Sequence, residues 1–268
     1  MTVQRRSFRS LGGDCELFGV DVGDSALSDG EAWIHRMHDR LTRFSEASEL
    51  SRFNARSGSW IKVSDELAAL LREGLRAYEV SGGLVHIATL EALLAAGYTR
   101  DFTLGGTATT DPPAPPRALP ELLQVRGTEA RLAKGAAVDL GGIAKGWLAD
   151  RLVERLGPDS LANLCGDLMA RGGGEAGDGW PVGFGEKTVL LKDTAAATSG
   201  TTKRSWGPGL HHLIDPRTSR PAVTDLEEVS VLATSATDAE IYAKVALLLG
   251  SVDAPRWLEG RALGWSLL

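Results

Sequence analysis

The chain has 268 residues, of which 43% are hydrophobic and 24% are charged, a composition typical of a globular protein with a sizeable core. Lys and Arg total 29 against 35 Asp and Glu, and this net charge of -6 argues against nucleic acid as a partner, because binding to phosphate backbones needs an excess of positive charge. With only two cysteines, Cys15 and Cys165, a disulfide framework is excluded.

The N-terminal residues Arg5–Arg9 look like a twin-arginine export signal, but no apolar stretch follows them. Residues 8–22 instead alternate apolar and polar side chains, which predicts a strand at the start of the fold. No window approaches the ~18 apolar residues that a membrane span needs. We therefore expect a cytoplasmic protein with no direct membrane insertion.

Apolar residues at helical spacing predict a helix over 29–43 and a second helix that begins at the capping residue Ser64 and ends near Val80. The residues between these helices, 45–60, are rich in turn formers. Four prolines in 105–118 exclude a helix or a central strand there.

That proline-rich segment is the predicted loop between two lobes, residues 1–104 and 119–268, of a single domain. Beyond it, a strand pair is predicted within 122–133, and a strand over 136–140 is predicted to lead into a helix that ends near Leu156. Further predicted elements are strands at 162–164, 180–184, 188–191, 195–198 and 229–233, and a helix over 238–249. Strands and helices do not alternate regularly, which favours an α+β fold over a doubly wound sheet.

The most informative stretch runs from Val138 to Gly146 and combines a predicted strand end, two glycines and a helix start with Lys145 in its first turn. Glycines allow close approach of the backbone to a ligand, and both a helix N-terminus and a lysine favour anions. Phosphate binding is the functional hypothesis for this stretch. The alternative is an ordinary tight turn with a solvated lysine, and the spacing alone does not decide between the two.

A second polar constellation spans Ala197–Arg204 and His211–Arg217, where small hydroxyls, Lys, Arg, His and Asp supply donors and a titratable base. Adjacent histidines in a strand point to opposite faces, so at most one of His211 and His212 is expected to enter a site. A zinc site is therefore not expected.

Together these segments resemble the family of FAD:protein FMN transferases, the ApbE-type flavin transferases, over nearly the whole chain. Five elements of the family pattern occur in the family's order: Ser51–Asn54, Asp139–Gly146, Asn163–Asp167, Ala197–Gly200 and His212–Ser219.

The resemblance implies an α+β fold of mixed sheets with packed helices, in which two coupled lobes enclose a flavin cleft. It also implies an enzyme that, with Mg²⁺, moves FMN from FAD onto a Thr or Ser hydroxyl of an acceptor flavoprotein and releases AMP. Attack of a hydroxyl on a pyrophosphate needs a base, neutralisation of charge and firm positioning.

By the same resemblance, His212 and Asp215 are the catalytic residues nearest the reacting centre, and which of them is the base stays open. The FAD-binding residues that the resemblance implies are Ser51, Arg52, Phe53, Asn54, Asp139, Gly141, Gly142, Lys145, Thr198, Ser199 and Gly200. Lys244 is a further candidate, although the family has a different residue at its position.

The metal position departs from the family pattern. In the family, a helix supplies an Asp and, four residues later, a Thr to the metal, together with a backbone oxygen that corresponds to Ala144. The positions of Asp and Thr are taken here by Glu240 and Lys244. Residues four apart share a helix face, but a protonated lysine has no acceptor with which to bind Mg²⁺.

Several interpretations of this pair stay open. In the first, Lys244 pairs with Glu240 and replaces the metal's charge. In the second, Glu240 still holds Mg²⁺ through waters while Lys244 reaches the phosphate. In the third, the alignment is offset and Asp238 is the ligand. An ordinary solvated ion pair is a further alternative. The corresponding alternatives for function are a non-catalytic FAD-binding protein and an FAD pyrophosphatase with an altered metal site.

Overall fold

The computed structural model describes residues 2–101, 104–184 and 187–268. The chain divides into two compact units, and each combines segments that are distant in sequence. Unit 1 comprises Met1–His38, Ala144–Ser199 and Glu228–Leu268, and unit 2 comprises Asp39–Ile143 and Gly200–Glu227. The lobes predicted from the sequence, by contrast, were two contiguous pieces of chain.

Unit 1 is built on a sheet of seven strands. The pairs β1–β2, β2–β6, β6–β7, β7–β10 and β15–β16 are antiparallel. In spatial order the strands are β1 (Val3–Ser10), β2 (Gly13–Val20), β6 (Ser160–Leu164), β7 (Asp167–Arg171), β10 (Ala195–Gly200), β15 (Glu228–Ala233) and β16 (Gly264–Leu267).

The single strand predicted over 8–22 is wrong, because β1 and β2 form a hairpin in this region. The turn lies at Leu11 and Gly12, whose φ angles of 55° and 81° reverse the chain. Alternation of apolar and polar residues continues on both sides of the turn, and for this reason the pattern alone did not reveal the reversal.

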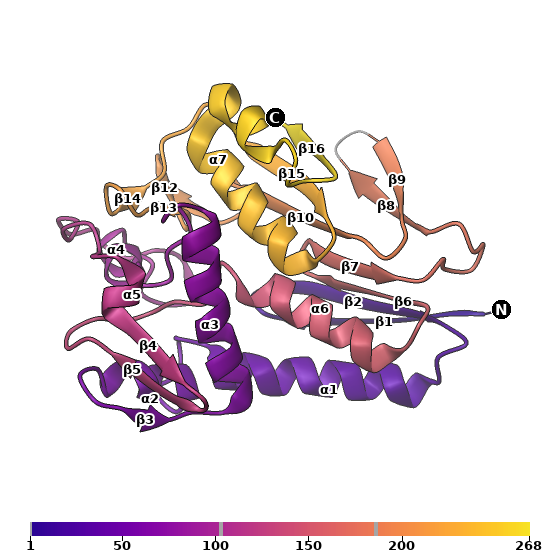
Figure 1. Ribbon diagram of the computed structural model, residues 1–268, viewed down its shortest axis with the longest axis horizontal. Helices are drawn as coiled ribbons and strands as arrows, with labels where there is room; N and C mark the ends of the chain where they lie inside the picture. Colours follow the sequence, from indigo (N-terminus) through magenta and orange to yellow (C-terminus); the bar gives the residue numbers. More distant parts are fainter. Residues whose placement is uncertain (1, 102–103, 185–186) are drawn as a thin grey trace. The chain divides into compact units, whose positions relative to one another are not determined.

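Helices α6 (Ala144–Leu156) and α7 (Ala236–Leu258) cover one face of this sheet (Figure 1). The hairpin of β8 (Trp180–Phe184) and β9 (Lys187–Leu191) packs on the other face, where Trp180 and Leu191 join a buried apolar cluster with sheet residues. Burial of apolar side chains on both faces stabilises the sheet and holds α6 and α7 against it.

The two helices meet closely at Gly146, where a Cβ atom would overlap the carbonyl oxygen of Ala236. One side chain of α6, Asp150, accepts hydrogen bonds from the backbone N–H groups of Ala236 at 2.7 Å and Thr237 at 3.0 Å, so α6 caps the N-terminus of α7. The predicted helix break at Gly250 is seen as a kink in α7 with a φ of 77°.

The N-terminal helix α1 (Asp24–Leu41) begins five residues before its predicted start and contributes its residues up to His38 to unit 1. Its Gly30 lies against Leu17, Leu152 and Leu156, and a Cβ there would come within 3.1 to 3.2 Å of these side chains. The small residue therefore lets α1 pack closely against α6 and the sheet.

Unit 2 contains the helices α3 (Asp65–Val80), α4 (Leu90–Ala95) and α5 (Leu119–Leu122), and a small sheet of β3 (Ile61–Lys62), β5 (Glu129–Leu132) and β4 (Leu123–Arg126). Two short hairpins follow later in the chain: β11 (Ser205–Gly207) with β12 (Leu210–His211), and β13 (Ile214–Asp215) with β14 (Arg220–Pro221).

Local predictions in unit 2 are confirmed where helix capping or proline residues determine the backbone conformation. The Ser64 hydroxyl caps α3 by accepting a hydrogen bond from the N–H of Leu67 at 3.2 Å, and residues 105–118 form neither helix nor strand. The helix α2 (Glu49–Ala55), capped by Ser48, lies in the segment for which only turns were predicted, and residues 136–140 do not form the predicted strand.

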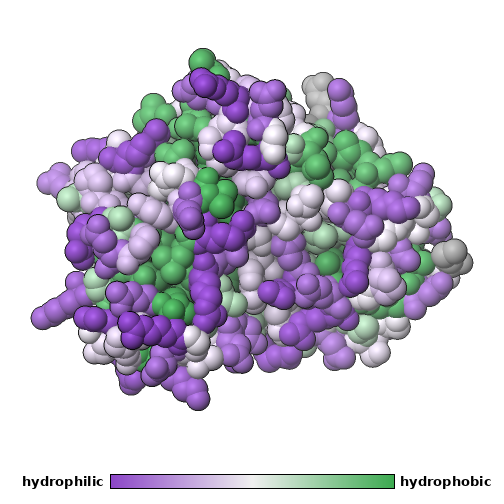
Figure 2. All heavy atoms as spheres, viewed as in Figure 1, coloured by the Kyte–Doolittle hydropathy of each residue, from purple (hydrophilic) through white to green (hydrophobic). Residues whose placement is uncertain are grey.

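On the face shown in Figure 2, hydrophobic surface is broken into separate patches among hydrophilic side chains. Within the described part of the chain, no helix combines the length and the hydropathy that crossing a bilayer requires.

Candidate functional site

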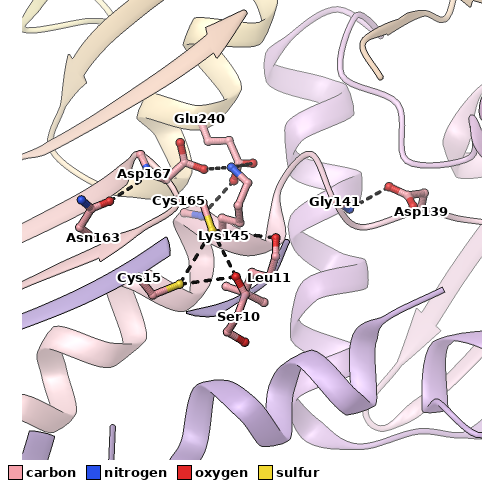
Figure 3. A network of polar contacts seen from close by, with 12 residues as sticks. Ser10, Leu11, Cys15, Asp139, Gly141, Lys145, Asn163, Cys165, Asp167 and Glu240 are labelled. Atoms are coloured by element: carbon pink, nitrogen blue, oxygen red, sulfur yellow. Dashed lines mark hydrogen bonds and ion pairs between the residues drawn. The ribbon is translucent and has the colours of Figure 1, made fainter. Parts of the chain in front are cut away.

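The glycine turn that begins at Asp139 leads from unit 2 into helix α6 of unit 1. The Asp139 carboxylate accepts a hydrogen bond from the N–H of Gly141 at 2.8 Å, which folds the chain back before the helix begins at Ala144 (Figure 3). Two hydrogen bonds of 2.9 Å join the Asn54 side chain to the backbone N–H and C=O of Val138. Asn54 in α2 therefore holds the segment that carries the turn.

Lys145, in the first turn of α6, lies between two buried carboxylates of unit 1 (Figure 3). Its Nζ pairs with Asp167 at the start of β7, and lies 3.3 Å from Oε1 of Glu240 in α7. The side chains of Asp167 and Glu240 are only 1% and 5% exposed, whereas that of Lys145 is 16% exposed. Their charges are thus buried but paired.

The remaining oxygen of Glu240 is also bound. Its Oε2 accepts a hydrogen bond of 2.9 Å from the backbone N–H of Gly146, one of the N–H groups in the first turn of α6. Glu240 therefore ties the N-terminus of α6 to the middle of α7 and, through its other oxygen, to Lys145.

Burial raises the pKa of Asp167 to about 7, and the negative charge of Glu240 acts in the same direction. The positive charges of Lys145 and Lys244 oppose that shift in pKa. Lys244 therefore acts on this cluster as well, and the four side chains form one electrostatic group of two cations and two carboxylates, which we call the lysine–carboxylate cluster.

The turn between β6 and β7 positions Asp167. The Asn163 side chain accepts a hydrogen bond from the N–H of Gly166 at 2.9 Å, and Cys165 and Gly166 both have positive φ, at 60° and 97°. The Sγ of Cys165 lies 3.8 Å from that of Cys15 on β2. Contact with Cys165 and burial raise the pKa of the Cys15 thiol, which makes it a packing group rather than a nucleophile.

Unit 2 holds a second charged pair, between Arg43 and Asp139. The Arg43 Nε lies 2.9 Å from Asp139, and its Nη2 donates to the Tyr98 carbonyl oxygen at 2.7 Å. The guanidinium also lies 4.2 Å and 4.5 Å from the ring centres of Phe44 and Tyr98. The ring of Tyr98 stacks on that of Trp206, at 5.1 Å between centres. These contacts fix Asp139, and so the turn that it makes with Gly141.

The two histidines differ in their surroundings. His211 is buried, its Nε2 lies 3.0 Å from the carbonyl oxygen of Ala222, and its Nδ1 accepts a hydrogen bond from the N–H of Leu213. Burial lowers the pKa of His211. Its ring nitrogens thus bond the backbone, and His212 is the histidine that can serve a site.

Asp215, on β13, is 8% exposed, and both of its oxygens accept hydrogen bonds from Arg217. The distances are 2.9 Å to Nε and 2.8 Å to Nη2, and the backbone N–H of Arg217 donates to Asp215 as well. Hydrogen bonding to Asp215 raises the pKa of Arg217. The pair has the forked, two-bond geometry that is typical of arginine with a carboxylate.

A sequence model of the ApbE family matches residues 13–265, nearly the whole chain. This chain belongs to the ApbE family. One relative, named FAD:protein FMN transferase from Treponema pallidum, is 32% identical over 266 residues, which cover 84% of this chain and 72% of that protein. A relative of the same name from Vibrio cholerae is 25% identical over 252 residues, covering 87% of this chain and 75% of that one.

Solved structures agree with the membership. The apo form of the flavinyl transferase ApbE of Pseudomonas stutzeri matches with a TM-score of 0.82 at 21% identity, covering 96% of this chain and 88% of that one. The ApbE protein of Thermotoga maritima matches with a TM-score of 0.86 at 18% identity, covering 99% and 94%. The family resemblance and the α+β fold predicted from the sequence are thereby confirmed.

The residues expected to form the ApbE site fall into two groups. Unit 1 contains Ala144, Lys145, Thr198, Ser199, Glu240 and Lys244. Unit 2 contains Ser51, Arg52, Phe53, Asn54, Asp139, Gly141, Gly142, Gly200, His212 and Asp215. The structure brings Lys145, Glu240 and Lys244 together around Asp167, and Asn54 together with the segment next to Asp139.

Some of the residues at these ApbE positions make structural contacts within their own unit. Phe53 is 1% exposed and belongs to the core, Arg52 donates to the carbonyl oxygen of Ala47, and the N–H of Ser51 is bound by the capping Ser48. The Thr198 hydroxyl lies 2.8 Å from that of Ser230 on the neighbouring strand β15. Their roles toward FAD stay predictions.

The magnesium site implied by the ApbE family, with Glu240 and a backbone oxygen of Ala144 as ligands, does not fit the side chains present. Glu240 already binds Lys145 and the N–H of Gly146, and the charges of Lys145 and Lys244 oppose a further cation. In residues 2–101, 104–184 and 187–268, no group of three or more His, Cys, Asp and Glu side chains could together hold a metal ion.

Sequence reasoning did not single out Asp167 or Arg43 as site residues. Asp167 was visible as the last residue of the family element Asn163–Asp167, but its partner Lys145 lies 22 residues earlier in the chain. Arg43 closes the first predicted helix without any motif of its own. Both gain their roles from contacts that only the folded chain makes.

Proposed function

We propose that this chain is an FAD:protein FMN transferase, which moves FMN from FAD to a Thr or Ser hydroxyl of an acceptor flavoprotein and releases AMP. The observation that carries the proposal is the intact Asp139–Gly146 element of a family member, with Lys145 held at the first turn of α6 by two buried carboxylates. The names of the relatives from Treponema pallidum and Vibrio cholerae support the same activity.

In this proposal, the glycine turn and Lys145 bind the pyrophosphate of FAD. Free N–H groups at a helix N-terminus and a lysine ammonium both favour phosphate oxygens. Asn54 and Arg43 keep the turn in place through Val138 and Asp139. The other FAD contacts that we propose are Ser51, Arg52, Phe53, Gly142, Thr198, Ser199, Gly200 and Lys244.

The transfer step forms a bond between the acceptor hydroxyl oxygen and the phosphorus of the FMN phosphate. The bond from that phosphorus to the bridging oxygen breaks, AMP departs, and the hydroxyl proton passes to a base. Both oxygens of Asp215 already accept hydrogen bonds from Arg217, so we assign the base to His212 and give Asp215 a positioning role. The cytoplasmic location expected from the sequence stays a prediction.

The test incubates the purified chain with FAD and an acceptor flavoprotein, and follows covalent flavin on the acceptor by intact mass and AMP by chromatography. Transfer predicts one FMN per acceptor Thr or Ser, matched by an equal amount of AMP. An acceptor with that Thr or Ser changed to Val or Ala is the control, and it should gain no flavin.

Two results would contradict the proposal. Release of AMP and FMN at the same rate with and without an acceptor indicates an FAD pyrophosphatase. FAD binding with no turnover indicates a passive flavin-binding protein. His212→Asn sharpens the assignment, because loss of transfer with FAD affinity retained is expected of a base and not of a binding residue.

A further inference from the structure

Three charged side chains of unit 1 meet from three elements: Lys145 of α6, Asp167 of β7 and Glu240 of α7. Lys244 of α7 acts on the same group through its charge, which lowers the pKa of Asp167. Residues 240 and 244 are one helical turn apart, so both lie on the same face of α7. The carboxyl groups of Asp167 and Glu240 in this lysine–carboxylate cluster are almost completely buried.

The carboxylates of the cluster are committed to partners of the chain itself. Glu240 binds Lys145 through one oxygen and the N–H of Gly146 through the other. Asp167 accepts a hydrogen bond from the Lys145 ammonium. A Mg²⁺ ion needs oxygen ligands at about 2.1 Å in near-octahedral geometry. Binding it at Glu240 would leave the Gly146 N–H without its acceptor and place a divalent charge beside Lys145.

Lysine side chains supply the positive charge that a divalent cation would bring. Lys145 and Lys244 together carry two positive charges, and each ammonium has three donors on a flexible stem. A pyrophosphate group attracts ammonium groups just as it attracts a metal ion. Unlike a metal ion, the ammonium groups are part of the protein and need no oxygen ligands to hold them in place.

We propose that this chain binds and uses FAD without a divalent cation, with Lys145 and Lys244 supplying the positive charge for the pyrophosphate. The inference rests on the proposed function for its substrate, and on the lysine–carboxylate cluster for its geometry. The proposal makes two claims that can be tested separately. The cluster does not bind a divalent ion, and the affinity for FAD does not depend on one.

The first test titrates Mn²⁺ into the purified chain and follows the paramagnetic resonance signal of the free aquo ion. The wild-type protein and Glu240→Gln should leave the same free signal. The double variant Glu240→Asp with Lys244→Thr supplies a shorter carboxylate and a hydroxyl in place of the ammonium, and should lower the free signal. Lys62→Thr, at an exposed lysine on β3, is the matched control and should behave like wild type.

The second test measures FAD affinity by quenching of tryptophan fluorescence, in EDTA and in millimolar Mg²⁺. The wild-type dissociation constants should agree within twofold in the two buffers, and those of the double variant should differ at least tenfold. Lys244→Met, which keeps the length of the stem without its charge, should weaken FAD binding in EDTA. Circular dichroism spectra of all variants check that they are folded.

Mn²⁺ bound by the wild-type chain and released by Glu240→Gln would overturn the proposal, and so would FAD affinity that rises tenfold or more in Mg²⁺. A double variant that leaves the Mn²⁺ signal unchanged would contradict the exchange of metal for lysine at these positions. Absence of FAD binding in both buffers would remove the proposed function, whereas the Mn²⁺ titration would still decide whether the cluster excludes a metal ion.

Discussion

Arg43 in unit 2 and Lys145 in unit 1 both pair with carboxylates, and the two cations differ in how firmly they are held. In unit 2, Arg43 is 6% exposed, bonds Asp139 and the Tyr98 carbonyl oxygen, and lies against two aromatic rings. In unit 1, Lys145 is 16% exposed and faces two carboxylates with a flexible stem. Arginine here fixes the backbone, whereas lysine can turn its ammonium toward a ligand.

Arg43 and Asp139 therefore form a structural pair, whereas Lys145 is the candidate for binding a ligand. Asp139 serves Arg43 with one oxygen and the N–H of Gly141 with the other, so the pair builds the glycine turn. In the proposed function, the carboxylates around Lys145 position a charge for the phosphate groups of FAD. We therefore expect substitutions at Arg43 to affect folding and substitutions at Lys145 to affect FAD binding.

The largest effect is expected for Arg43→Ala, which leaves the partly buried Asp139 without its cation and removes the contacts with Phe44 and Tyr98. Breaking one partner of a buried ion pair costs about 3–5 kcal/mol in the free energy of unfolding. Urea denaturation followed by tryptophan fluorescence measures this loss. Arg43→Lys keeps the charge and should lose less, and an Arg43→Ala protein within about 1 kcal/mol of wild type would refute the structural role.

Lys145→Ala is expected to weaken FAD binding about 30-fold to 100-fold, which corresponds to loss of a charge-assisted hydrogen bond worth about 2–3 kcal/mol. Fluorescence titration with FAD measures the affinity. The exposed Lys62→Ala is the matched control. If Lys145→Ala binds FAD as tightly as wild type, the comparison between the two pairings fails and the lysine has no part in the site.

Asn54→Ala removes two hydrogen bonds of 2.9 Å to the backbone of Val138. We expect a loss of about 2 kcal/mol in unfolding free energy, because a buried N–H and C=O lose their partners. FAD affinity should fall as well, since the turn at Asp139 is then less well held. Asn54→Asp keeps the acceptor for the Val138 N–H and should recover part of the stability; equal loss in both variants would contradict this account.

The last prediction concerns the pH dependence of stability. Because the pKa of Asp167 is raised from 3.8 to about 7 in the folded state, its contribution to stability is complete below pH 3.8 and is lost as pH rises through 7. The slope is at most about 1.4 kcal/mol per pH unit. Denaturation at several pH values should give Asp167→Asn a flatter profile than wild type between pH 4 and 7, and parallel profiles would show that Asp167 does not titrate there.

Where short-range chemistry decides the backbone, prediction from the sequence succeeded. Ser64 is a cap because its hydroxyl reaches an N–H three residues on, and the prolines in 105–118 exclude regular structure through their own rings. Prediction failed at the hairpin turn of Leu11 and Gly12 and at the helix α2. In both places a locally ambiguous segment takes the form that its packing selects.

For the site, the sequence by itself determined the family and indicated candidate residues: the glycine turn before Lys145 and the pair Glu240 and Lys244. Only the tertiary structure decided their partners, because Glu240 meets the start of α6 across 94 residues of chain. A motif records residue types and spacing over a few positions. Whether a carboxylate is left for a metal or is bound by a lysine depends on contacts between distant segments, which form when their apolar faces are buried together.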